Sequence, residues 1–357
     1  MRLNASTAFA FLSACCRPLG LLSVAAVAAC SGMTPASTTP GPSVSTPASG
    51  SLSSPTPVKV GIALGGGAAK GFAHIGVIKM LEANGFAPAV VAGTSAGSVV
   101  GALYASGMTA FELQEKAVAR DEAQIRDLQL SFGGLVLGQR LEDYVNEQVQ
   151  RRPLEQLAKP FVAVATRLED GERTVFARGN TGQAVRASSS VPGLFQPVVI
   201  GKYRFVDGGV VSPVPVDAAR QLGADVVIAV DISNKARGQS PADMLGTIGQ
   251  SIAIMGQKLG QAELARADII VRPQVLDIGA ADFTQRASAI LEGEKAALAV
   301  MPQIRERIAQ LQAARDQATR VAQQKAAEAQ RQACLEQRSR LQRLADIARL
   351  DVACPAP

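Results

Sequence analysis

One serine of this sequence stands in a setting that could make it a nucleophile. Ser95 is the third residue of Gly93-Thr94-Ser95-Ala96-Gly97, directly after the apolar residues 90–92. Glycines on both sides permit a sharp turn between a strand and a helix, which exposes the hydroxyl at the carboxyl end of the strand. The start of the following helix stabilises developing negative charge there. The alternative is a glycine-rich turn that contains a serine by chance.

The base that would activate this serine is restricted by the presence of only one histidine, His74. His74 lies on a predicted helix, where a buried structural role is the simpler interpretation, so a Ser-His-Asp triad has one poorly placed candidate. Asp207 instead opens Asp207-Gly208-Gly209, a glycine turn after an apolar stretch. An exposed aspartate is a weak base, but a dry pocket would raise its pKa. If Ser95 is activated, Asp207 is the natural base.

A glycine-rich loop, GGGAAKG, occupies 65–71 between the apolar run 58–64 and an amphipathic helix expected over 72–83. A dinucleotide fingerprint would need glycine at position 70, and a phosphate loop would need Gly-Lys-Ser/Thr, so both nucleotide interpretations fail. A tight turn without chemistry is one alternative. The other is an oxyanion hole, whose candidate donors are the backbone N–H groups of Gly65, Gly66, Gly67 and Ala68.

Apolar runs alternate with helical stretches along the middle of the chain, which predicts an α/β sheet covered on both faces. Strands are expected over 58–64, 90–92, 161–166, 173–177, 225–231 and 267–272. Helices are expected over 72–83, from 98 through about 120, over 140–150 and over 242–265.

The overall composition excludes several classes of function. The chain has 357 residues and a formal net charge of +6, without a dense basic run interleaved with aromatic residues, so nucleic-acid binding is disfavoured. A zinc site built from several histidines is impossible, and we expect no metal or other cofactor.

The amino terminus is expected to be a targeting segment and not part of the fold. Residues 1–30 read as a signal peptide whose end, Val27-Ala28-Ala29-Cys30, resembles a bacterial lipoprotein box with Cys30 as the lipidated residue. Cys15 is a rival site, and an ordinary secretory signal is the other alternative. Residues 31–57 are rich in Ser, Thr and Pro and are expected to be a disordered tether.

The carboxyl terminus, 302–357, changes to Ala, Gln, Arg and Glu with apolar residues at helical spacing, which predicts a basic helical hairpin or short coiled coil. Its basic excess could contact anionic lipids, but a solvated helix face is the favoured interpretation. Cys334 and Cys354 could form a disulfide in an oxidising compartment, but only if the chain doubles back between them.

Four motifs together resemble the patatin-like phospholipase family in their order and spacing. They are 65–71 (GGGAAKG), 93–97 (GTSAG), 190–195 (SVPGLF) and 207–209 (DGG), with PVP following at 213–215. The resemblance implies a three-layer α/β/α fold with a mostly parallel sheet over 58–301. It also implies Ser95 as nucleophile, Asp207 as base and the glycine loop as oxyanion hole.

One basic residue of the glycine loop, Lys70, has no role in this reaction scheme. By resemblance Lys70 fixes the loop or meets a lipid phosphate, and a solvated surface lysine is the alternative. An extra alanine in the loop, relative to shorter versions in the family, leaves open which amides point inward.

The activity that the resemblance implies is hydrolysis of phospholipid or lysophospholipid esters without a cofactor, and the lipoprotein box and tether predict that the protein is held at a membrane. The alternative is a catalytically silent envelope lipoprotein that binds a lipid or a partner with the same fold. Ser31 after Cys30 is not an inner-membrane retention aspartate, so we expect an outer-membrane anchor facing the periplasm. The sequence does not indicate an oligomeric state.

Overall fold

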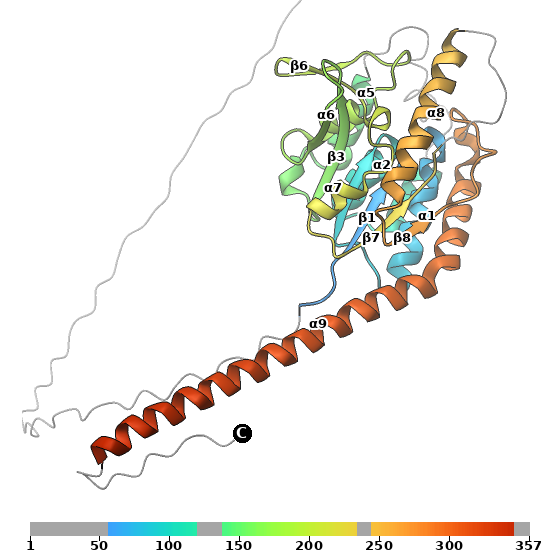
Figure 1. Cartoon of the computed structure of the whole chain (residues 1–357). Helices are drawn as coiled ribbons and strands as arrows, with labels where there is room; N and C mark the ends of the chain where they lie inside the picture. Colours follow the sequence, from blue (N-terminus) through green and yellow to red (C-terminus); the bar gives the residue numbers. More distant parts are fainter. Residues whose placement is uncertain (1–55, 120–137, 234–243, 346–357) are drawn as a thin grey trace, which may run out of the picture. The chain divides into compact units, whose positions relative to one another are not determined.

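The computed structural model describes residues 56–119, 138–233 and 244–345 (Figure 1). Its strands are β1 (Val60–Leu64), β2 (Val90–Thr94), β3 (Phe161–Arg167), β4 (Arg173–Phe176), β5 (Val198–Ile200), β6 (Tyr203–Asp207), β7 (Val226–Val230) and β8 (Ile269–Val271). They form one sheet in the order β5-β6-β3-β2-β1-β7-β8, with β4 paired to β3. The pairings among β3, β2, β1, β7 and β8 are parallel, and those of β4, β5 and β6 are antiparallel.

Helices cover both faces of this sheet, which gives the three-layer α/β/α arrangement that the sequence predicts. The helices are α1 (Phe72–Ala83), α2 (Ala96–Ala105), α3 (Ala110–Ala119), α5 (Gln139–Gln148), α6 (Thr181–Ser188), α7 (Val216–Gln221), α8 (Met244–Leu264) and α9 (Arg286–Ala345). Alternate residues of β1 and β7 enter two separate cores: Ile62 and Ile228 pack with α1, α2 and α9, whereas Ala63 and Val227 pack with α7 and α8.

Two strands approach each other end to end along the same side of β3. Thr94, the last residue of β2, pairs with Val164, and Asp207, the last residue of β6, pairs with the adjacent Ala165. Because β4 occupies the other side of both β3 residues, the two strand ends must lie next to each other. β2 runs parallel to β3 and β6 runs antiparallel to it, so their carboxyl ends meet.

Most of the expected elements are confirmed, but the helix expected to run from 98 to about 120 is interrupted. The structure has α2 and α3 there, separated at Gly107, whose φ of 106° is outside the helical region. Glycine adopts this conformation without steric cost and ends α2.

The C-terminal part of the described chain is one continuous helix, α9, that runs through Pro302. The expected hairpin is therefore wrong as far as Ala345. The expected end of the catalytic domain at residue 301 falls inside α9, and Ile304 is still fully buried in the core. Beyond Ile308 most side chains of α9 are exposed.

α1 and α9 cross at two glycines. A Cβ at Gly76 would lie 2.0 Å from the Ile290 carbonyl oxygen, and a Cβ at Gly293 would lie 2.0 Å from the Ala73 carbonyl oxygen. The two backbones are thus in direct contact, and neither position has room for a side chain.

Residues 1–55, which include the expected signal peptide, Cys15, Cys30 and all but the last two residues of the expected tether, lie outside the described residues, as does Cys354. Cys334, on α9, is disulfide-bonded, and its pairing with Cys354 stays a prediction. In the part of the chain that the structure describes, no helix is both long and apolar enough to cross a membrane.

Candidate active site

The hydroxyl of Ser95 donates a hydrogen bond to Asp207 at the point where β2 and β6 meet. Ser95 Oγ lies 2.6 Å from Asp207 Oδ2, and both residues are buried, with exposed fractions of 9% and 6%. The structure therefore brings together the two residues that the sequence selects as nucleophile and base, although 112 positions separate them.

The turn that carries Ser95 is strained and has no room for larger neighbours. Ser95 has φ 54° and ψ −124°, a region that residues other than glycine rarely adopt. A Cβ at Gly93 would lie 2.4 Å from the Gly97 carbonyl oxygen, and one at Gly97 would lie 2.1 Å from the Leu64 carbonyl oxygen. Both glycines of the G-x-S-x-G motif are thus required sterically by this turn.

Asp207 is held by hydrogen bonds on every side of its backbone and carboxylate. Its Oδ1 accepts the Gly209 N–H at 2.7 Å, its carbonyl accepts the Thr166 hydroxyl, and its N–H donates to the Ser190 carbonyl. Gly208 is equally constrained, because a Cβ there would lie 2.1 Å from the Val164 carbonyl oxygen.

Burial raises the pKa of Asp207 from 3.8 to about 6, and the hydrogen bonds from Ser95 and Gly209 oppose this rise. A carboxylate with this pKa is ionised at neutral pH and is a stronger base than an exposed aspartate. The buried environment of Asp207 thus gives its carboxylate a basicity that could not be established from the sequence.

The glycine loop approaches Ser95 closely, but not all of its amides face the site. A Cβ at Gly66 would lie 3.2 Å from Ser95 Cβ. The N–H of Gly65 donates to the Val230 carbonyl, and that of Gly66 donates to the Pro213 carbonyl. These two residues therefore do not supply oxyanion donors in this structure, which corrects the sequence-based expectation. Gly67 and Ala68 remain the candidates, and Ala68 has a strained φ of 51°.

His74 supports this loop and has no contact with the nucleophile among its hydrogen bonds. Its Nε2 donates to the Gly65 carbonyl at 2.8 Å, while its Nδ1 is buried without a partner. Complete burial lowers its pKa from 6.5 to about 4, so the ring is neutral at neutral pH. A structural role is thus the correct interpretation of this histidine.

Lys70 is only 2% exposed, so its interpretation as a solvated surface lysine is wrong. It belongs to the short 3-10 helix Ala68–Gly71, and its N–H donates to the Gly67 carbonyl. This placement favours the fixing of the glycine loop over contact with a lipid phosphate.

Ser188 is a site residue that the sequence analysis missed. Its hydroxyl accepts the N–H of Ser95 at 3.0 Å and donates to the Val164 carbonyl at 2.6 Å. It thereby anchors the backbone of the nucleophile to β3. The serine triplet 188–190, whose last residue begins the SVPGLF motif, is the signal that could have identified it.

Residues 56–119, 138–233 and 244–345 contain no group of three or more His, Cys, Asp or Glu side chains arranged to hold a metal ion. Their chemistry at the Ser95 site consists of a hydroxyl, a carboxylate and backbone amides. This set is suited to acyl transfer through a serine nucleophile.

The sequence that forms this site matches a known protein family. Residues 62–220 match the family model described as "Patatin-like phospholipase". This range includes the glycine loop, Ser95, Ser188 and Asp207.

The similar proteins include an uncharacterized NTE family protein of Mycobacterium tuberculosis, 35% identical over 182 residues, or 50% of this chain and 51% of that protein. Lysophospholipase NTE1 of Pyricularia oryzae is 32% identical over 181 residues, 49% of this chain and 12% of that protein. The chain therefore spans about half the length of its mycobacterial relatives. Among solved structures, the ExoU–SpcU complex of Pseudomonas aeruginosa has a TM-score of 0.46 at 17% identity, covering 83% of this chain and 68% of that chain.

Proposed function

Because residues 62–220 belong to the patatin-like phospholipase family, we propose that the protein is a serine hydrolase of lipid esters, of the phospholipase A or lysophospholipase type. The observation that carries the proposal is the buried 2.6 Å hydrogen bond between Ser95 Oγ and Asp207 Oδ2. The two residues work as a dyad, because the one histidine is neutral, buried and bonded elsewhere.

In the first half-reaction, Ser95 Oγ attacks the ester carbonyl carbon and its proton passes to Asp207. The negative charge that develops on the carbonyl oxygen is stabilised by the N–H groups of Gly67 and Ala68. The tetrahedral intermediate then expels the alcohol, which takes the proton back from Asp207, and leaves the acyl group on Ser95.

In the second half-reaction, Asp207 takes a proton from water, and the resulting nucleophile attacks the acyl-enzyme. The intermediate collapses, the fatty acid leaves, and the proton on Asp207 returns to Ser95 Oγ. The ionised carboxylate that starts each half-reaction is available at neutral pH because the pKa of Asp207 is about 6.

A lipid substrate agrees with the surface next to the site. α8 passes beside the turn that follows Asp207, since a Cβ at Gly256 would lie 3.8 Å from the Gly209 carbonyl oxygen. The large exposed apolar side chains of this helix are Ile248, Ile254, Met255 and Leu259. Such side chains suit contact with a lipid surface beside the reacting serine.

We further propose that the protein is a lipoprotein of the bacterial envelope, anchored through Cys30 and facing the periplasm from the outer membrane. The sequence around Cys30 and the Ser/Thr/Pro-rich residues 31–57 support this proposal. Metabolic labelling with an alkyne fatty acid, followed by membrane fractionation, tests it. Label must disappear in Cys30→Ser and persist in Cys15→Ser. The reverse pattern would move the anchor to Cys15. If no form of the protein takes up label, the lipid anchor is rejected.

The activity is tested with the full chain in detergent, a fluorophosphonate probe and a panel of phospholipid and lysophospholipid esters. Wild type is expected to become labelled and to release fatty acid, whereas Ser95→Ala and Asp207→Asn do neither. Ser251→Ala, which removes an exposed hydroxyl bonded to Thr247, is the matched control and should behave like wild type. A folded wild type that binds lipid but neither reacts nor hydrolyses would establish the alternative, a silent lipid-binding lipoprotein.

A further inference from the structure

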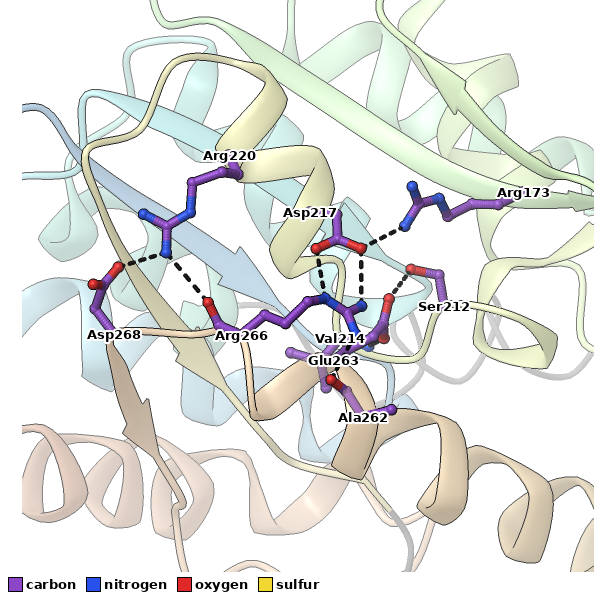
Figure 2. Close-up of polar contacts among 9 residues, drawn as sticks. All are labelled: Arg173, Ser212, Val214, Asp217, Arg220, Ala262, Glu263, Arg266 and Asp268. Carbon is purple, nitrogen blue, oxygen red and sulfur yellow. Dashed lines mark hydrogen bonds and ion pairs between the residues drawn. The ribbon is translucent and has the colours of Figure 1, made fainter.

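Glu263, near the end of α8, is a buried carboxylate to which the proposed reaction assigns no role. It is 5% exposed, and both of its oxygens accept hydrogen bonds from one short turn, 212–214 (Figure 2). Oε1 accepts the hydroxyl of Ser212 at 2.5 Å, and Oε2 accepts the N–H of Val214 at 2.8 Å. Glu263 thus fixes the turn at two points from the α8 side.

The opposite side of this turn contacts both parts of the candidate active site. The Ser212 carbonyl accepts the hydroxyl of Thr94 at 2.8 Å, and Thr94 is the residue before the nucleophile. The Pro213 carbonyl accepts the N–H of Gly66 at 3.0 Å, and Gly66 immediately precedes the candidate oxyanion donors. The three residues of the turn 212–214 therefore connect Glu263 to the turn that carries Ser95 and to the glycine loop.

The position of Glu263 is itself fixed by ion pairs around the end of α8, which Figure 2 shows. Arg266 binds both oxygens of Asp217 on α7 at 2.8 Å, and Arg173 on β4 reaches the same carboxylate. Arg220 joins the Arg266 carbonyl to Asp268. These contacts hold the end of α8 against α7, β4 and the strand that follows.

We propose that Glu263 is a positioning residue, which sets the distance between the Ser95 nucleophile and the oxyanion donors by clamping the turn 212–214. The inference rests on the proposed hydrolase function and adds a residue to it from outside the matched residues 62–220. The turn transmits this effect to the site through its hydrogen bonds with Thr94 and Gly66.

A charged residue here is expensive, which argues against simple space filling. Burial raises the pKa of Glu263 to about 7, although Arg173 and Arg266 favour its charged form. An apolar side chain of similar size would avoid this desolvation, but it would leave the Ser212 hydroxyl and the Val214 N–H without their partner. The carboxylate is the group that satisfies both donors of the turn at once.

The test compares Glu263→Leu and Glu263→Gln in the full chain. Leucine cannot accept either hydrogen bond, so kcat and the rate of fluorophosphonate labelling should fall about 100-fold with KM little changed, as expected for a small displacement of reacting groups. Glutamine can accept the Val214 N–H and donate to the Ser212 hydroxyl, so it should retain activity close to wild type.

The matched control is Leu264→Ala, the next residue of α8, which is buried in the same apolar core as Val214 but whose side chain cannot accept a hydrogen bond from the turn. It should lower the melting temperature while leaving kcat and the labelling rate near wild type. Hydrogen exchange of the Gly66 amide provides a readout besides activity: it should accelerate in Glu263→Leu and not in Leu264→Ala.

Glu263→Leu with wild-type labelling and wild-type Gly66 exchange would overturn the inference, as would an equal loss of activity in Leu264→Ala. If Glu263→Leu does not fold, Ser212→Ala removes one of the two clamp contacts and should still slow labelling and accelerate Gly66 exchange; no change in either overturns the proposal. Failure of wild type itself to label would instead reject the hydrolase function, and the positioning role with it.

Discussion

Ser95 Oγ and Asp207 Oδ2 lie 2.6 Å apart, while the other carboxylate oxygen of Asp207 is occupied by the Gly209 N–H. One oxygen is thus directed at the nucleophile and the second is fixed by the backbone. The carboxylate cannot rotate away from Ser95 without losing a hydrogen bond inside a buried site, where an unsatisfied partner is costly. This arrangement leads to several measurable expectations.

Hydrolysis is expected to rise with pH through a single titration near pH 6. Asp207 accepts the serine proton only when ionised, and its pKa is about 6. The measurement is kcat/KM for a lysophospholipid between about pH 4 and pH 8. Glu263→Gln should keep this midpoint. An unchanged midpoint assigns the titration to Asp207 and not to the other buried carboxyl group, Glu263. A profile that is flat across this range would contradict the assignment of Asp207 as the base.

Asp207→Asn should be inactive but more stable than wild type at neutral pH. The pKa of Asp207 is higher in the fold than its ordinary 3.8, so ionisation of this buried group opposes folding. Its contribution to stability falls as pH rises from 3.8 to about 6, by on the order of 3 kcal/mol. Thermal unfolding at about pH 8 should show the higher melting temperature, and the gain should shrink near pH 4. An equal gain at both pH values would exclude ionisation as its source.

His74→Gln should retain most of the hydrolytic activity, because His74 supports the glycine loop and does not accept the serine proton. A glutamine amide can donate to the Gly65 carbonyl in place of Nε2. His74→Leu cannot donate and should be less active and less stable. Loss of activity in His74→Gln equal to that in Ser95→Ala would restore a triad.

The same histidine gives a stability prediction with the opposite pH dependence. The pKa of His74 is about 4 in the fold against 6.5 ordinarily, so its neutral form favours folding above pH 6.5 and this contribution is lost as pH falls toward 4. The acid-induced drop in melting temperature should therefore be smaller in His74→Gln than in wild type. Urea unfolding at a series of pH values provides a second measurement of the same difference.

Gly66→Ala should fold and yet react slowly. The added Cβ would lie 3.2 Å from Ser95 Cβ and 3.9 Å from Ser95 Oγ, so it would crowd the side of the serine that faces the oxyanion donors. The expected loss in fluorophosphonate labelling is roughly 100-fold, similar to the loss of one oxyanion donor. Gly279→Ala, at an exposed position where the added Cβ would lie an ordinary 3.5 Å from Asp282 Cβ, is the control for an added methyl group. Unchanged labelling in Gly66→Ala would place the oxyanion hole elsewhere.

The sequence identified the parts of the site whose chemistry is local. A few consecutive residues are enough to recognise the serine between two glycines, the aspartate before a glycine turn and the single histidine. The strands around them are continuous apolar runs. The fold class followed from the alternation of such runs with helices.

The contacts that arrange these parts depend on tertiary structure and could not be predicted from the sequence. Which amides of the glycine loop face the serine is decided by the carbonyls of Val230 and Pro213, far along the chain. In the sequence, Glu263 is simply the one acidic residue of a helix whose other charged residue is Lys258, and its contacts with the turn 212–214 come only from the fold. The expected hairpin after residue 302 is wrong as far as Ala345, because α9 continues to that residue without a turn and the helical spacing of apolar residues does not indicate where a helix reverses.

The glycine contact between α1 and α9 bears on how natural variants of this protein should be judged. Replacing Gly76 or Gly293 by alanine would force apart two backbones that already touch, and α1 begins directly after the loop that carries Gly67 and Ala68. Substitutions at these two positions would therefore be classed as inactivating in a genetic screen, although neither residue has any part in the chemistry. In a set of diverged sequences, glycine at 76 and 293 would then indicate a preserved helix crossing and would not by itself indicate a preserved enzyme.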